Sequence, residues 1–138
     1  MLSPPLEILR RALKLSAAGG LDEAIDVLNQ GIALCEREPE HLAMLPRLIS
    51  TLGLFYRRAD RPGQAISAVQ RALLLCPQDR QLLYFLADLV LESGDVSGAA
   101  LTALELRLVC ERNPETFSAD WAEALALLEN RITAYGRI

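Results

Sequence analysis

Residue types that perform chemistry are few in this chain and poorly placed for it. The 138 residues contain one histidine, His41, so a catalytic relay or a histidine-rich metal site would depend on a single side chain. We interpret His41, which follows Pro39 at an expected helix start, as an exposed polar residue. The acidic pair Asp22–Glu23 falls in a first helical turn, where it offsets the helix dipole. We therefore predict no catalytic residue, no metal site and no cofactor, and a protein that is not an enzyme.

Three cysteines occupy one repeating position. Each lies eleven residues after an alanine, in the pairs Ala24–Cys35, Ala65–Cys76 and Ala99–Cys110. An odd number of widely separated cysteines does not suggest a disulfide framework. We interpret each cysteine as a small buried side chain near a helix end, not as a metal ligand or redox group.

Two further features have a ligand interpretation and a structural one. Gly19–Gly20 is too short to cradle a phosphate and lacks the lysine that such loops carry. Trp121 could stack on a ligand, but its helical spacing to Leu125 and Leu128 favours core packing. We interpret both features as structural.

The charge balance limits the kinds of partner. Lys and Arg number 14 against 18 Asp and Glu, a formal net charge of −4. Without a basic stripe, the counterion release that drives nucleic-acid binding is missing, so we predict no nucleic-acid partner. Charged residues interrupt the apolar pattern of the first sixteen residues, so we expect neither a signal peptide nor a membrane span. A cytoplasmic location follows as the expectation.

The alanines that precede the cysteines reveal an internal repeat. Ala65 and Ala99 are 34 residues apart, whereas Ala24 and Ala65 are 41 apart, which is the same period plus seven residues. Between the alanine-anchored helices lie further segments with apolar residues at helical spacing, and Gly and Pro separate the segments. These segments are residues 6–17, 47–58, 81–92 and about 118–134. The sequence therefore predicts an all-α fold of about seven helices in short-looped antiparallel pairs.

The stretch from Ile49 to Pro77 resembles one whole tetratricopeptide (TPR) repeat, a unit of about 34 residues. The pattern positions are occupied by Leu52, Gly53, Tyr56, Ala65, Val69, Ala72 and Pro77, with Ile49 and Val69 in place of the aromatic residues of the pattern. This resemblance implies a right-handed α-solenoid of about three TPR-like helix pairs, ended by a C-terminal capping helix. It further implies a single domain over 1–138, with repeats at about 5–39, 46–79 and 80–114 and the cap at about 118–134.

The flanking repeats match the TPR pattern less closely. Arg11 and Gly31 depart from it in the first repeat, and Leu106 replaces its second alanine in the third. The seven extra residues around Pro39 to Leu45 alter the local geometry. Pro46 allows two alternatives there: a kink in a long helix that starts near Glu40, or the start of a new helix.

In TPR proteins the first helix of each pair lines a concave groove, and the resemblance assigns such positions here. Carboxylate-binding members use a clamp of Lys, Asn and Arg, but Leu9 and Leu13 stand at the first clamp positions, so we expect no clamp. The groove is then expected to take an apolar peptide or amphipathic helix whose acidic residues face Arg57 and Arg58. The alternative for these two arginines is compensation of the helix dipole. The predicted lining is Leu6, Leu9, Leu13 and possibly Ser16, then Arg47, Ser50, Leu54, Arg57 and Arg58, then Gln81, Tyr84, Asp88 and Leu91.

An exposed Leu9, Leu13 and Leu54 would form an apolar patch that monomers seldom leave uncovered. We therefore predict a protein–protein interaction module, an adaptor or chaperone that binds an apolar or amphipathic segment of another protein. In size and architecture the chain also resembles small bacterial secretion-system chaperones. The alternative is a structural, self-assembling protein in which a second copy covers the leucine-rich face, for example as a homodimer.

Overall fold

The computed structural model describes residues 3–137 and is helical throughout, which confirms the all-α prediction. Seven α-helices and two short 3-10 segments make up this part of the chain, with no strand in it. Their bounds are α1 (Pro4–Ala17), α2 (Leu21–Arg37), η1 (Pro39–Met44), α3 (Leu45–Arg58), α4 (Pro62–Leu75), α5 (Arg80–Glu92), α6 (Val96–Arg112), η2 (Pro114–Thr116) and α7 (Ala119–Gly136).

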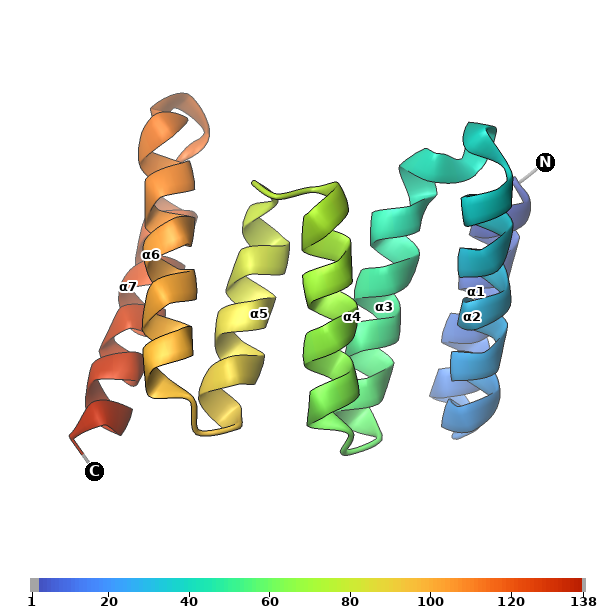
Figure 1. Cartoon of the computed structure of the whole chain (residues 1–138), viewed down its shortest axis with the longest axis horizontal. Helices are drawn as coiled ribbons and strands as arrows, with labels where there is room; N and C mark the ends of the chain where they lie inside the picture. Colours follow the sequence, from blue (N-terminus) through green and yellow to red (C-terminus); the bar gives the residue numbers. More distant parts are fainter. Residues whose placement is uncertain (1–2, 138) are drawn as a thin grey trace. The chain divides into compact units, whose positions relative to one another are not determined.

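Contacts divide the chain into two compact units, with the boundary between Cys76 and Pro77. In the first unit, each helix from α1 to α4 packs on the next one along the chain (Figure 1). In the second unit, α5 packs on α6, α6 on α7, and α7 also contacts α5. The predicted single domain and its repeat bounds stay predictions.

One type of turn joins the two helices of each pair. Its central residue has a positive φ in all three copies: 89° at Gly19, 57° at Asp60 and 92° at Gly94. The next N–H donates to a carbonyl five residues back, as from Gly20 to Leu15 at 2.8 Å, which is the wrapping bond of a helix C-cap. These turns recur at intervals of 41 and 34 residues, the same intervals as the anchor alanines. The repeat in the sequence is therefore also a repeat in backbone conformation.

The seven inserted residues form the 3-10 segment η1, and α3 begins directly after it. Pro46 lies in the first turn of α3, where its missing N–H costs nothing, so it starts a new helix instead of kinking an old one. The interpretation of His41 as exposed is wrong. Its side chain is 16% exposed, and its Nε2 lies 3.1 Å from Glu38 Oε2, because the tight 3-10 turn brings residues three apart together.

The core combines large aliphatic side chains with small residues at repeating positions. Ala24, Ala65 and Ala99 are all fully buried. Cys35 and Cys110 are also fully buried, as predicted, whereas Cys76, at the end of α4, is only half-buried. Burial and the nearby Glu38 raise the pKa of the Cys35 thiol, which keeps it protonated and unreactive.

Side chains cap some of the helix starts and not others. Ser3 stands at the N-cap position of α1, but its side chain makes no capping hydrogen bond. Asp79, Asp95 and Ser118 do cap α5, α6 and α7 with their side chains. Of the helices that the structure describes, none is both long enough and apolar enough to cross a membrane.

Candidate functional site

In the first unit, the predicted groove positions on α1 divide between the surface and the core. Leu13 is 45% exposed and Leu6 is half-buried, but Leu9 is only 2% exposed. The assignment of Leu9 to an open groove is therefore wrong. Both α2 and the inserted segment η1 contact α1, so α1 buries a wider face than packing on one partner helix requires.

On α3 the predicted positions stay at least partly accessible. Arg47 and Arg58 are exposed, and Ser50, Leu54 and Arg57 are half-buried. Ser50 Oγ donates a hydrogen bond to the Arg47 carbonyl at 3.0 Å, so its hydroxyl is used within the helix.

Arg58 ties two of the predicted faces together. Its Nη1 donates to Ser16 Oγ on α1 at 3.1 Å, and its guanidinium lies 6.0 Å from the centre of the Phe55 ring. Arg58 thus has a structural role as a link between α1 and α3, in addition to its predicted role in binding.

The predicted α5 residues have three different environments. Gln81 is exposed, Tyr84 is half-buried, and Asp88 accepts a hydrogen bond from Arg131 Nη2 of α7 at 2.7 Å. Leu91 is fully buried, so its assignment to the groove is wrong. The last turn of α5 is largely apolar, and both α6 and α7 pack on α5. Leu91 is therefore enclosed.

A cleft of about 380 Å³ opens between α5 and α7. Two of its walls are the predicted Gln81 and Tyr84, and α7 supplies the rest. The rings of Tyr84 and Trp121 meet edge to face, with centroids 6.4 Å apart and planes at 72°. The full lining is Gln81, Tyr84, Asp120, Trp121 and Ala124.

Sequence reasoning missed the α7 half of this cleft. Trp121 was interpreted as core because Leu125 and Leu128, at helical spacing from it, are indeed fully buried. Trp121 itself is half-buried. It lies in the first turn of α7, before the fully buried part of the helix begins. An aromatic residue three positions after the capping Ser118 was the one signal available.

Polar contacts at both ends hold the two walls of the cleft. Arg80, at the start of α5, donates hydrogen bonds to the Thr116 carbonyl at 2.6 Å and the Asn113 carbonyl at 3.3 Å, which fixes the loop before α7. Two turns further along α5, the Asp88–Arg131 pair joins the same helices. The cleft walls are thus fixed at two separate points.

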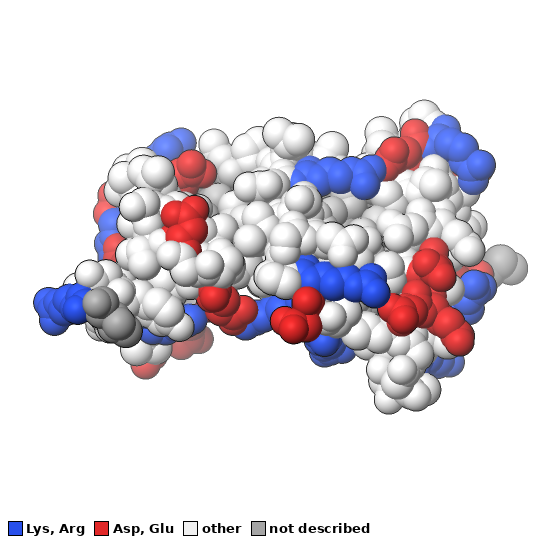
Figure 2. Space-filling model, turned by 60° about the horizontal axis from the view of Figure 1, so that its bottom comes forward, with Lys and Arg blue, Asp and Glu red and all other residues white. Residues whose placement is uncertain are grey.

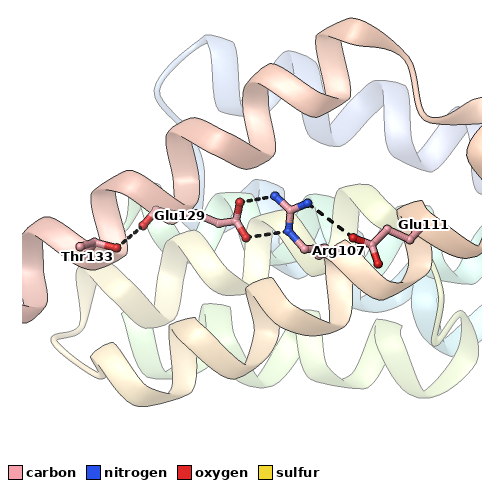
Figure 3. A network of polar contacts seen from close by, with 4 residues as sticks. All are labelled: Arg107, Glu111, Glu129 and Thr133. Atoms are coloured by element: carbon pink, nitrogen blue, oxygen red, sulfur yellow. Dashed lines mark hydrogen bonds and ion pairs between the residues drawn. The ribbon is translucent and has the colours of Figure 1, made fainter.

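A second network fastens α7 to α6. Figure 3 shows Arg107 between two carboxylates: its Nε and Nη2 donate to Glu129 at 2.9 and 2.5 Å, and its Nη1 lies 3.6 Å from Glu111. These hydrogen bonds lower the pKa of Glu129 although partial burial opposes the shift. The position of Trp121 therefore rests on a helix anchored to both of its neighbours in the unit.

One group of metal-ligating residue types occurs among residues 3–137. Donor atoms of Glu38, Glu40 and His41 lie within 4.8 Å of one another in and next to the 3-10 turn. The imidazole already pairs with Glu38, and Glu40 is exposed. Among residues 3–137, no polar or charged side chain is buried.

Figure 2 shows the charged residues on one face of the molecule. On the face drawn in Figure 2, groups of Lys and Arg adjoin groups of Asp and Glu, and uncharged side chains cover most of the area between them.

No protein-family model matches the sequence, and no curated protein is significantly similar to it. Solved structures, in contrast, match over nearly the whole chain. The type III secretion chaperone SycD of Yersinia enterocolitica, in complex with a peptide of the translocator YopD, has a TM-score of 0.74 at 14% identity over 98% of this chain and 95% of that one.

Two further structures agree on the fold. PcrH of Pseudomonas aeruginosa, in complex with the chaperone binding region of PopD, has a TM-score of 0.70 at 23% identity, covering 96% of this chain and 95% of that one. The Sgt2 TPR domain of Aspergillus fumigatus has a TM-score of 0.72 at 15% identity, covering 99% and 84%. The chain therefore has the fold of these TPR proteins, as its middle repeat indicated.

Proposed function

We propose that this protein is a binding module, an adaptor or chaperone that holds an apolar or amphipathic segment of another protein. The segment would lie against the exposed faces of α1, α3 and α5, the first helices of the three pairs. The observation that supports this proposal most directly is that apolar and aromatic side chains on those faces are accessible to solvent. Leu13 is 45% exposed on α1, and Tyr84 and Trp121 wall an open cleft beside α5. Exposed apolar side chains at ligand-facing positions lose the free energy of burial unless a partner covers them.

The structural likeness supports the same proposal. SycD, whose fold this chain shares, was crystallised with a peptide of the translocator YopD, and PcrH, of the same fold, with the chaperone binding regions of PopB and PopD. We propose a cytoplasmic location on the same grounds. The absence of a carboxylate clamp remains part of the proposal, because Leu13 and the buried Leu9 occupy the first clamp positions.

The decisive experiment is co-purification from the native host with the wild-type chain and two variants. Leu13→Glu and Leu54→Glu place a charge on the α1 and α3 faces and are expected to abolish capture of the partner. Far-UV circular dichroism should stay close to wild type, since neither side chain is fully buried.

A matched control separates binding from general surface effects. Leu74, on α4, is 83% exposed and outside the predicted faces, so Leu74→Glu should retain the partner. Loss of capture in all three variants, or retention in all three, would contradict the proposal. Unfolding of the Leu13 or Leu54 variant would show that its leucine is core.

A second candidate function, self-assembly, is favoured by one observation on α6. Leu101, Leu104 and Leu108 are 65%, 52% and 41% exposed and follow one another along a single helix face. A second copy of the chain is the occupant that this alternative requires.

A further inference from the structure

We infer that the cleft between α5 and α7 receives a basic side chain, arginine or lysine, of the protein partner, an inference that rests on the proposed function. The lining combines the rings of Tyr84 and Trp121 with the carboxylate of Asp120 and the amide of Gln81. None of the lining residues is cationic. Aromatic faces attract cations through the ring quadrupole, and tryptophan does so most strongly.

The carboxylate of Asp120 is available for such a partner. It makes no ion pair or hydrogen bond with any residue that the structure describes. The nearest guanidinium along α7 that engages α5 is Arg131, which already pairs with Asp88 at 2.7 Å. Position 120, in the first turn of α7, also lets the carboxylate offset the helix dipole, and the experiment below separates this role from binding.

The second unit has a net negative charge, which also favours a cationic side chain in the cleft. Residues 77–138 contain five Arg and no Lys against ten Asp and Glu, whereas residues 1–76 are nearly balanced, with nine cations against eight anions. Of the five arginines, Arg107 and Arg131 bind carboxylates and Arg80 binds backbone carbonyls. The field around the cleft therefore attracts a cation.

The geometry fits a long basic side chain better than a compact apolar one. The cleft is broadly open to solvent, and its aromatic walls are half-buried, so an aliphatic stem can lie on the rings while its charged end stays at the edge. A purely apolar anchor would leave the exposed Asp120 carboxylate without a charged partner.

Trp121 makes this inference directly measurable, because it is the only tryptophan in the chain. The full-length protein is titrated, with Trp121 fluorescence as the readout, with a short capped peptide that carries one arginine among leucines and alanines. The same peptide with citrulline, a neutral analogue of nearly equal shape, is the comparison. Binding of the arginine peptide is expected to be roughly five- to thirtyfold tighter.

Three variants assign the effect to the cleft. Tyr84→Leu keeps an apolar wall but removes the ring, and Asp120→Asn removes the charge at constant shape. Each should cut the preference for arginine over citrulline severalfold. Glu123→Gln removes a charge from the same helix but outside the cleft lining, and it should leave the preference for arginine unchanged. Glu123 lies only three residues further along α7. An effect seen with Asp120→Asn and not with Glu123→Gln therefore cannot come from the helix dipole alone.

The outcomes are distinct. Equal binding of the two peptides, with both weakened by Tyr84→Leu, would overturn the cation inference while leaving the proposed binding function intact. Absence of any fluorescence response at millimolar peptide would overturn the inference as well, and the native co-purification would then decide on the proposed function by itself. A preference that Asp120→Asn and Tyr84→Leu leave intact would place the cation elsewhere and equally refute the assignment.

Discussion

Asp60 shows how one residue can depart from a repeated backbone conformation. It has φ 57° at the turn where the two equivalent positions are Gly19 and Gly94. A side chain in this region is strained, although aspartate tolerates it better than most residues. We expect Asp60→Gly to raise the free energy of unfolding by about 0.5–1 kcal/mol. Chemical denaturation of the purified variant measures this change.

The reciprocal change is the control. A Cβ added at Gly94 meets nothing within 4 Å, so the new side chain meets no steric obstacle there. Gly94→Asp should therefore lower the stability by a similar amount. If both variants shift stability in the same direction, backbone strain does not explain the pair.

Glu129 gives the fold a dependence on pH. Hydrogen bonds from Arg107 hold the pKa of Glu129 below its ordinary value in the folded chain. The stabilisation is therefore complete above the ordinary pKa and is lost as the pH falls through the lowered one. We expect Glu129→Gln to lose stability less steeply than wild type between about pH 5 and pH 3. Glu123→Gln should keep the wild-type slope, and thermal melts across this range test both variants.

At the scale of the elements, the crossing of α1 and α2 depends on Gly31. A Cβ built there lies 2.7 Å from Ile8 Cγ2 and 3.5 Å from Leu48 Cδ1. The overlap costs about 1–3 kcal/mol in a packed core, whereas alanine gains about 1 kcal/mol in helix propensity. The overlap is the larger effect, so we expect Gly31→Ala to lower the free energy of unfolding by roughly 1 kcal/mol.

The obstacle itself can be removed to check this cause. In an Ile8→Ala background the methyl group that blocks the new Cβ is gone, so Gly31→Ala should become neutral or stabilising. Gly63, in the first turn of α4 with nothing within 4 Å, is the exposed control, and Gly63→Ala should stabilise the protein. Additive behaviour of the Ile8 and Gly31 changes would contradict the explanation.

The sequence predicts elements better than it predicts what lies between them. The period of 34 residues located the helix pairs, because each turn and each anchor alanine recurs with it. Leu9 was misassigned because its burial involves the packing of α1 against both α2 and η1, and η1 interrupts the period. Trp121 was misassigned because the contact between α5 and α7 joins residues about 37 positions apart that no repeat relates. Tertiary contacts of this kind are set by packing and not by local pattern.

At the scale of the whole molecule, the exposed stripe of Leu101, Leu104 and Leu108 on α6 decides between a partner protein and a second copy. The three side chains are on average about half exposed. A two-fold pairing would bury the same stripe of both copies, a gain of roughly 4–9 kcal/mol from six leucines. Association costs about 4–15 kcal/mol in lost freedom of motion. The stripe alone therefore supports at most a weak dimer.

We accordingly expect light scattering to show a monomer at micromolar concentration, with the apparent mass rising only at much higher concentration. Leu104→Glu, at the centre of the stripe, should abolish that rise, because pairing would bring two unpaired carboxylates together in an apolar contact. Leu74→Glu, on α4, should leave it unchanged. A stable dimer at the lowest measurable concentration that Leu104→Glu dissociates would instead favour self-assembly, since the stripe would then hold the copies together without any other protein.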